Sequence, residues 1–206
     1  MLDSVEAENL LCVVIVPGDS AMTELALKHL HPNWTYKCSD EVEVEEIGTF
    51  EKKRITHSMP SDLKVTSVVK VMNPYLWSCY QLKKAEYMNR YGSVTEKTLY
   101  HATSKSNIDS IIRSNLDWRR SCRIRFGQGV SFSPSPSYAN TYCNRRNGIY
   151  RAMIAATVLV NNTAEGNSWT TLPPTDIDTT VGNSLQVYVK YSDNEFYPQY
   201  VIYYNI

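Results

Sequence analysis

The last third of the chain contains apolar segments of the kind that form buried β-strands. Residues 150–160 are rich in small and β-branched residues, residues 187–191 alternate between the two faces of a strand, and residues 200–204 are aromatic and β-branched. Helical signals lie earlier, in the first and middle parts of the chain. This order predicts an α+β domain in which two small antiparallel sheets pack with helices on their outer faces.

Two helices are predicted from their first residues and from the spacing of their apolar residues. Asn73 and Pro74 form an N-cap and first-turn pair, and the helix that follows is expected to end at Gly92. Ser106 followed by Asp109 matches a capping box, and isoleucines recur at helical spacing after it. Both helices therefore precede the strand-rich third.

The remaining elements are predicted from shorter signals. Residues 98–103 are expected to form a strand, and residues 135–143 a third helix. In the first part of the chain, residues 10–16 suggest a buried strand, residues 20–30 a helix and residues 41–50 an acidic edge strand.

The chain is expected to be one intracellular domain that spans residues 1–206, because no repeat or linker divides it. The apolar run near the N-terminus is short and follows acidic residues, which fits neither a signal peptide nor a membrane span. Five scattered cysteines without C-x-x-C spacing predict neither a disulfide framework nor a metal site. A reducing compartment, nuclear or cytoplasmic, is expected.

Charge is distributed unevenly along a chain whose formal net charge is zero. Acidic residues outnumber lysines over residues 1–51, and arginines dominate residues 104–151. Such a basic segment can attract a phosphate-bearing ligand, or it can be a solvated surface balanced by the acidic N-terminal part. The arginines lack interleaved aromatic residues, so nucleic-acid binding is not indicated.

Several residues near the middle of the chain have both a structural and a functional interpretation. His101 ends a predicted strand just before a helix, where folds of this kind place ligands, but a lone histidine is more often structural. Gly127 and Gly129 permit a tight turn or a close backbone approach without forming a phosphate loop. Tyr138 and Tyr142, four residues apart, are by themselves more often an aromatic pair in the core than a ligand contact.

Six short segments, in their order along the chain, resemble the catalytic domain of the poly(ADP-ribose) polymerase family. The similarity is clearest over residues 64–206, leaving residues 1–63 unassigned, and is strongest to the mono-ADP-ribosyltransferase branch with the TCDD-inducible and CCCH zinc-finger antiviral members. The segments are L-Y-H-A-T-S at 99–104, N-L-D-W-R at 115–119, F-G-Q-G-V-S-F-S at 126–133, the tyrosines at 138 and 142, L-Q-V-Y-V at 185–189 and Y-P-Q-Y-V-I at 197–202. The resemblance implies an ADP-ribosyltransferase-like fold.

The resemblance also implies a catalytic triad at His101, Ser131 and Val187. The histidine is expected to bind a hydroxyl of the nicotinamide ribose. Ser131 stands where the family has a tyrosine. Val187 stands where chain-elongating members have a glutamate that activates the acceptor hydroxyl, and its replacement is expected in a mono-transferase.

A second set of residues is expected to contact NAD, again by resemblance. The backbone of Ala102 would hold the nicotinamide carboxamide and the ring of Tyr142 would stack on the nicotinamide, with Thr103 and Gly129 nearby. Ala139 stands where the family usually has a serine that donates to the carboxamide. Two family contacts are therefore absent from this chain.

The function implied is mono-ADP-ribosylation of a protein side chain, with NAD as co-substrate and nicotinamide as leaving group. The alternative is a catalytically inactive domain of the same fold that acts as a binding or scaffolding module. No membrane partner is expected, and the acceptor protein is not identified.

Overall fold

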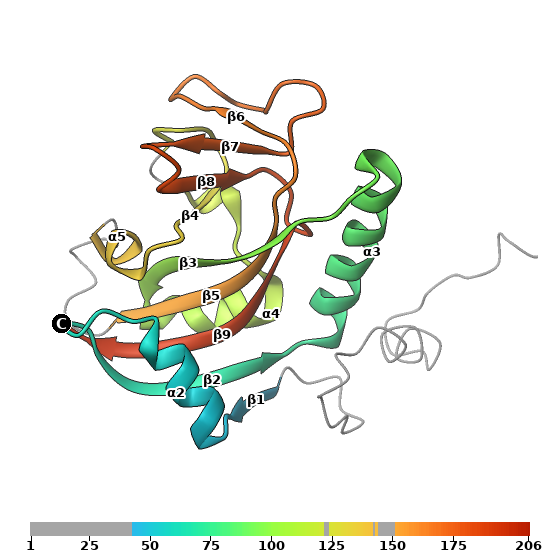
Figure 1. The fold of residues 1–206 in the computed structure, drawn as a ribbon. Coiled ribbons are helices and arrows are strands. Elements are labelled where there is room, and N and C mark those ends of the chain that lie inside the picture. Colours follow the sequence, from blue (N-terminus) through green and yellow to red (C-terminus); the bar gives the residue numbers. More distant parts are fainter. Residues whose placement is uncertain (1–42, 122–123, 142, 144–150) are drawn as a thin grey trace, which may run out of the picture.

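The structure, a computed structural model, describes residues 43–121, 124–141, 143 and 151–206, and it has the predicted α+β architecture (Figure 1). The expectations for residues 10–16, residues 20–30 and Tyr142 lie outside these ranges. Two sheets lie one beside the other, and α3 runs along one side of both (Figure 1). The helices described are α2 Thr49–His57, α3 Pro74–Tyr91, α4 Ile108–Ser114 and α5 Pro136–Thr141.

The larger sheet has five strands in the order β1-β2-β9-β5-β3, and every neighbouring pair is antiparallel. Its strands are β1 Glu43–Glu46, β2 Lys64–Met72, β3 Glu96–Ser104, β5 Arg151–Leu159 and β9 Phe196–Asn205. Two of the three strands predicted over the last third are confirmed here as β5 and β9, which pair with each other. β5 is buried over almost its whole length, because both faces of the sheet are covered.

Alternation along the strands divides the core of this sheet between its two faces. On one face, Ile154 and Val201 belong to a cluster that includes the isoleucines of α4. On the other face, Met153 and Ile202 pack with Ile55 of α2 and with α5. Helices therefore cover both faces, as predicted.

The smaller sheet has four short strands in the order β4-β8-β7-β6. They are β4 Val130–Phe132, β6 Thr163–Glu165, β7 Thr179–Gly182 and β8 Val187–Lys190. The β6–β7 pair is parallel, so this sheet is mixed rather than wholly antiparallel. It packs on the α4 side of the larger sheet, where Phe132 and Tyr188 join the same cluster as the α4 isoleucines.

A β-bridge joins the two sheets. The backbone N–H of Tyr100 in β3 donates to the Ser133 carbonyl at 2.7 Å, and the Ser133 N–H donates back to the Tyr100 carbonyl at 2.9 Å. Because this bridge lies next to His101, it fixes β4 relative to the strand that carries the histidine.

The predicted helix after Asn73 is confirmed as α3. The Asn73 side chain accepts a hydrogen bond from the Leu76 N–H at 3.0 Å, and Gly92 ends the helix with a positive φ of 72°. The Asn73 amide also donates to the Ile112 carbonyl at 2.8 Å, which ties the start of α3 to the end of α4.

Two local predictions differ from the structure. The capping box at Ser106 is wrong: residues 105–107 form a 3-10 turn, and Ser106 donates its N–H to the hydroxyl of Ser104. The Ser104 hydroxyl caps this turn, and such a local side-chain bond shifts where a helix begins. The predicted edge strand over residues 41–50 is shorter than expected, because α2 follows β1 after Gly48.

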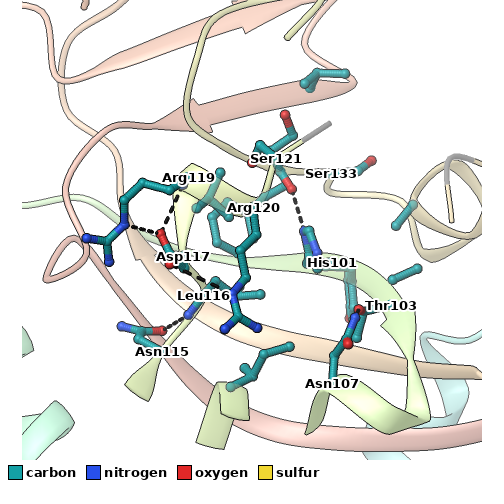
Figure 2. A pocket seen from close by; sticks show the side chains of 18 of the residues that line it. His101, Thr103, Asn107, Asn115, Leu116, Asp117, Arg119, Arg120, Ser121 and Ser133 are labelled. Carbon is teal, nitrogen blue, oxygen red and sulfur yellow. Dashed lines mark hydrogen bonds and ion pairs between the residues drawn. The ribbon is translucent and has the colours of Figure 1, made fainter. Parts of the chain in front are cut away.

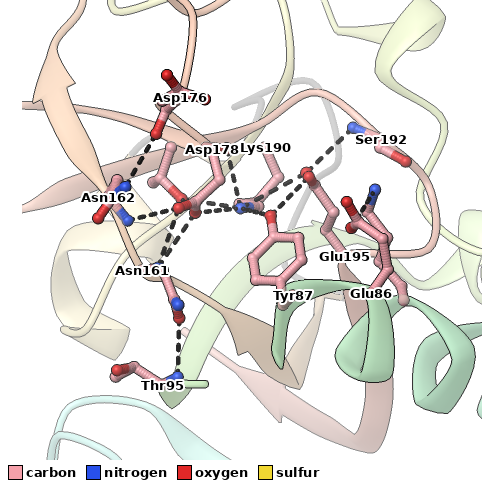
Figure 3. A network of polar contacts seen from close by, with 12 residues as sticks. Glu86, Tyr87, Thr95, Asn161, Asn162, Asp176, Asp178, Lys190, Ser192 and Glu195 are labelled. Atoms are coloured by element: carbon pink, nitrogen blue, oxygen red, sulfur yellow. Dashed lines mark hydrogen bonds and ion pairs between the residues drawn. The ribbon is translucent and has the colours of Figure 1, made fainter. Parts of the chain in front are cut away.

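A buried polar network holds α3 against the smaller sheet (Figure 3). The ammonium of Lys190 in β8 lies 2.9 Å from Asp178 Oδ1 and 3.5 Å from Glu195 Oε2, and it donates to the Tyr87 hydroxyl of α3 at 3.2 Å. Tyr87 donates in turn to Glu195 at 2.7 Å. Burial, reinforced by the charge of Glu195, raises the pKa of Tyr87, so its hydroxyl stays protonated and can donate.

Candidate functional site

A cavity of about 860 Å³ opens between β3, α4, the segment that follows α4 and the strands β4 and β8 (Figure 2). Its wall includes side chains from both sheets, beside the bridge that joins them. His101 and Thr103 lie on one side of it, and Asp117 and Arg119 on the other (Figure 2). A cavity of this size is typical of a site for a small organic ligand.

His101 lies in the second half of β3 and lines the cavity. Its Nδ1 is 2.9 Å from the Ser131 carbonyl, and since a carbonyl oxygen only accepts, Nδ1 carries the proton. Burial lowers the pKa of His101, and the hydrogen bond to Ser131 opposes this shift. Its ring makes an edge contact with Phe132, at 6.0 Å between centroids. The neutral imidazole is thus held in one tautomer, with Nε2 as hydrogen-bond acceptor.

The other two predicted triad residues line the same cavity. Ser131 in β4 stands opposite Val189 in β8, and Val187 is two residues from Val189 along that strand. Because side chains alternate, Ser131 and Val187 share one face of the smaller sheet. The fold thus brings the three residues from β3, β4 and β8 to one cavity, while their catalytic roles stay predictions.

Some of the residues predicted to contact NAD line the cavity, and others do not or lie outside the described residues. Ala102, Thr103 and Ala139 line the cavity. The Thr103 hydroxyl accepts from the Asn107 amide at 3.0 Å, and Ala139 of α5 is buried in the apolar cluster that also contains Ile55 of α2. Tyr142 lies outside the described residues.

Gly129 is not among the residues that line the cavity. A Cβ at this position would lie 2.2 Å from the Lys190 carbonyl oxygen, so a larger residue would push β4 away from β8. The structure therefore gives Gly129 a packing role beside the strand that carries Ser131. Its proposed contact with NAD stays untested.

A charged cluster occupies the far side of the cavity from His101. Asp117 Oδ1 accepts from the backbone N–H of Arg119 at 2.9 Å and from its Nε at 2.7 Å, and Arg120 Nε lies 3.9 Å from Oδ2. The hydrogen bond from the Arg119 side chain lowers the pKa of Asp117. Both arginine side chains are largely exposed, Arg119 at 67%, so they can meet a ligand phosphate.

Asn115 fixes the segment that carries this cluster. It has a positive φ of 68°, which ends α4, and its amide donates to the carbonyls of Asp193 at 2.7 Å and Phe196 at 3.0 Å. The motif N-L-D-W-R thus begins with a buried residue that anchors the charged cluster to the connection between β8 and β9.

Asp193 is a cavity residue that the sequence did not indicate. It lies between β8 and β9, and its Oδ1 is buried without a hydrogen-bond partner in the part of the chain that the structure describes. Burial raises the pKa of Asp193, the charge of Arg119 lowers it and the charge of Asp117 raises it again. The Asn115 amide holds the backbone of Asp193 in place. Because the two residues are far apart in sequence, no local motif predicts this contact.

Within the described ranges, no group of histidine, cysteine, aspartate and glutamate side chains is placed to hold a metal ion. The helices in those ranges are also too short or too polar to cross a membrane.

Comparisons with known proteins give the chain a family. The family model described as the poly(ADP-ribose) polymerase catalytic domain matches residues 42–186. The human protein mono-ADP-ribosyltransferase PARP12 is 30% identical in an alignment of 155 residues that covers 68% of this chain and 22% of that protein. Human protein mono-ADP-ribosyltransferase PARP11 is 24% identical in an alignment of 171 residues that covers 68% of this chain and 51% of that protein.

A third relative, the mouse zinc finger CCCH-type antiviral protein 1, is 25% identical over 99 residues, 45% of this chain and 10% of that protein. The chain thus spans about a fifth of PARP12 and about half of PARP11. The family match covers more than half of this chain and includes β1 and α2, which precede the segment where the resemblance was clearest. The chain therefore belongs to the poly(ADP-ribose) polymerase catalytic domain family.

Proposed function

We propose that this chain transfers single ADP-ribose units from NAD to a protein side chain and releases nicotinamide. The observation that carries the proposal is the fixed tautomer of His101, which leaves Nε2 as an acceptor on a cavity of suitable size. Relatives named mono-ADP-ribosyltransferases support the same activity.

The reaction breaks the bond between ribose C1′ and the nicotinamide nitrogen, and the electron pair leaves with neutral nicotinamide. A lone pair on the acceptor side chain then forms the new bond to C1′. Little proton transfer is needed to start this reaction, so catalysis rests on holding and orienting the substrate. His101 Nε2 would accept from a ribose hydroxyl, and Arg119 and Arg120 would attract the diphosphate.

Because Val187 stands in place of a glutamate, we expect transfer to stop after one ADP-ribose unit. An aliphatic side chain has no group to activate a ribose hydroxyl as the next acceptor, and Val187 lines the cavity beside Ser131. Incubation with labelled NAD should give discrete, singly modified products on a gel. A ladder of polymer would contradict this prediction.

One observation favours a second function, that of a binding module without activity. Ser131 and Ala139 both line the cavity and offer neither the ring nor the hydroxyl that the family resemblance places there. Calorimetric titration with NAD and with a nicotinamide-mimicking inhibitor separates the two functions. Binding of both supports the enzyme, whereas binding of neither supports the module.

The double variant Ser131→Tyr with Ala139→Ser should bind NAD more tightly than the unmodified protein. The new ring and hydroxyl should together contribute about 1 to 3 kcal/mol, or roughly five- to a hundredfold in Kd, if the two sites act independently. Ser131→Tyr alone should account for at least half of the gain, because it adds apolar area as well as polarity.

The control for this prediction is Ser61→Tyr, which places the same ring on an exposed turn outside the cavity. Calorimetry on all variants gives the Kd. An unchanged or weaker Kd in a folded double variant would favour the binding module.

A further inference from the structure

Tyr138 lines the cavity but has no part in the proposed reaction. It lies in α5 beside Ala139, and its hydroxyl accepts a hydrogen bond from the side-chain amide of Asn183 at 3.0 Å. Asn183 directly follows β7 and begins the turn that leads into β8. The hydrogen bond therefore joins α5 to the smaller sheet at the wall of the cavity.

The turn between β7 and β8 has a backbone conformation that its residues rarely adopt. Asn183, Ser184 and Leu185 have positive φ angles of 51°, 53° and 64°. Asparagine tolerates the left-handed region better than most residues, whereas serine and leucine are disfavoured there. Strained backbone of this kind persists only where the neighbouring structure holds it. The turn therefore depends on its contacts with other elements.

Tyr138 is a fixed partner for this turn. The Tyr138 N–H donates to the Ser135 hydroxyl at 3.3 Å, and the Ser135 N–H donates to the Ser133 hydroxyl at 3.1 Å. Ser133 belongs to the β-bridge with Tyr100. The hydrogen bond from Asn183 thus attaches the strained turn to the part of the fold that carries the catalytic-site strand β3.

The turn leads into Val187, so its position affects one end of the cavity. Val187, Tyr138 and Ala139 line this Val187 end, where the side chains of Val187 and Ala139 offer no polar group that could hold a water molecule. Leu185 in the turn is 53% exposed, so solvent lies directly outside. The proposed function expects nicotinamide and the acceptor side chain at this end.

Water competes with the acceptor in the proposed reaction. Once the bond between ribose C1′ and the nicotinamide nitrogen has broken, a lone pair of either can form the new bond to C1′. Attack by water gives free ADP-ribose and a proton, and the acceptor stays unmodified. Efficient transfer therefore requires that water is excluded from the Val187 end of the cavity.

We propose that the hydrogen bond between Asn183 and Tyr138 holds the β7–β8 turn against the Val187 end of the cavity and thereby favours transfer of ADP-ribose over hydrolysis of NAD. The two residues are positioning residues, because they act through the turn. The inference rests on the proposed function, since it requires NAD to react in this cavity. Without the hydrogen bond, the strained turn relaxes away from α5 and admits water beside Val187.

The test measures how each turnover ends. Every turnover releases a nicotinamide, and only a turnover that ends in water releases free ADP-ribose. Chromatography early in a reaction with NAD, with the chain itself as acceptor, gives both amounts and hence the ratio of hydrolysis to transfer. This ratio counts completed turnovers only, so it does not depend on the amount of folded protein.

Tyr138→Phe removes the hydroxyl and keeps the ring, so the ratio of hydrolysis to transfer should rise by about two- to tenfold, the effect of losing one hydrogen bond. Tyr75→Phe is the matched control, because it makes the same change at an exposed position of α3 outside the cavity, and it should leave the ratio unchanged. Asn183→Asp is the conservative variant. Aspartate also tolerates a positive φ and can accept from the Tyr138 hydroxyl, so the ratio should stay close to that of the unmodified protein.

The inference is overturned if Tyr138→Phe and Tyr75→Phe give the same ratio, if Asn183→Asp raises the ratio as much as Tyr138→Phe does, or if Tyr138→Phe abolishes the release of nicotinamide. It is also overturned if the unmodified protein releases as much free ADP-ribose as nicotinamide, because water then reaches C1′ while the hydrogen bond is intact. If the unmodified protein releases no nicotinamide, the proposed function itself fails, which distinguishes the two failures.

Discussion

Two clusters of this domain pair basic side chains with carboxylates and differ in their exposure to solvent. In the network around Lys190, the ammonium is fully buried and has Asp178, Glu195 and Tyr87 around it. Beside the cavity, Asp117 holds Arg119 and Arg120, whose side chains are mostly exposed. Because the Lys190 network is buried, the loss of any partner in it should lower the stability of the fold. Because the arginines beside Asp117 are exposed, they can exchange bound water for a ligand.

The largest effect is expected from Lys190→Met, which removes the cation between two buried carboxylates. The free energy of unfolding should fall by about 3 to 5 kcal/mol, because Asp178 and Glu195 remain buried without it. Urea unfolding measures this loss.

The matched control for Lys190→Met is Lys84→Met. It breaks the ion pair between Lys84 Nζ and Glu96 Oε2, which lie 2.6 Å apart on partly exposed side chains. That change should cost less than about 1 kcal/mol. Equal losses in the two variants would remove the distinction between a buried and an exposed cluster.

A smaller effect, on binding rather than stability, is expected from Arg119→Gln. The free energy of unfolding should change by less than about 1 kcal/mol, because the Asp117–Arg119 pair is exposed. NAD should bind several times more weakly at low salt, and the difference should shrink as salt screens the phosphate contact.

Arg90→Gln provides the comparison, since Arg90 pairs with Asp176 on the surface outside the cavity. Calorimetry at two salt concentrations reports the binding of both variants. If Arg119→Gln lost stability without losing affinity, the cavity cluster would be structural like the Lys190 network.

The smallest effect is a pH dependence of stability from His101, which lies across the cavity from the Asp117 cluster (Figure 2). Its pKa is lowered in the folded protein, so below about pH 6.5 the unfolded chain takes up a proton that the folded chain does not. The free energy of unfolding should therefore fall as the pH drops from about 6.5 toward the folded pKa, and it should be insensitive to His101 above that range.

His101→Asn should remove this part of the slope, since its amide can still donate to Ser131 but does not titrate. Urea unfolding between about pH 5 and 8 measures the difference between the two proteins. Identical pH profiles would mean that His101 is as solvated as an exposed histidine.

The sequence predicted those elements whose signals are local. The start of α3 at Asn73 and its end at Gly92 depend on neighbouring residues only, and both are confirmed. The strands β4, β6 and β7 were not predicted, because three or four residues carry little pattern and their pairing joins distant segments. The parallel β6–β7 pair was missed for the same reason.

The candidate site was predicted by resemblance rather than by local physics. His101, Ser131 and Val187 come from three strands, and only the order of the family motifs suggested that they share a cavity. The buried Oδ1 of Asp193 and the positive φ of Asn115 arise from packing between the end of α4 and the β8–β9 connection. No sequence window contains both partners, so neither feature was predictable.

The β-bridge between Tyr100 and Ser133 has a consequence for amide hydrogen exchange. The amide protons of Tyr100 and Ser133 form hydrogen bonds from one sheet to the other, whereas the strand pairs of each sheet form hydrogen bonds within that sheet. A small separation of the sheets would expose these two amides to solvent while the amides of β5 and β9 stay protected. Their exchange rates therefore report the opening of the cavity beside His101 separately from unfolding of the domain.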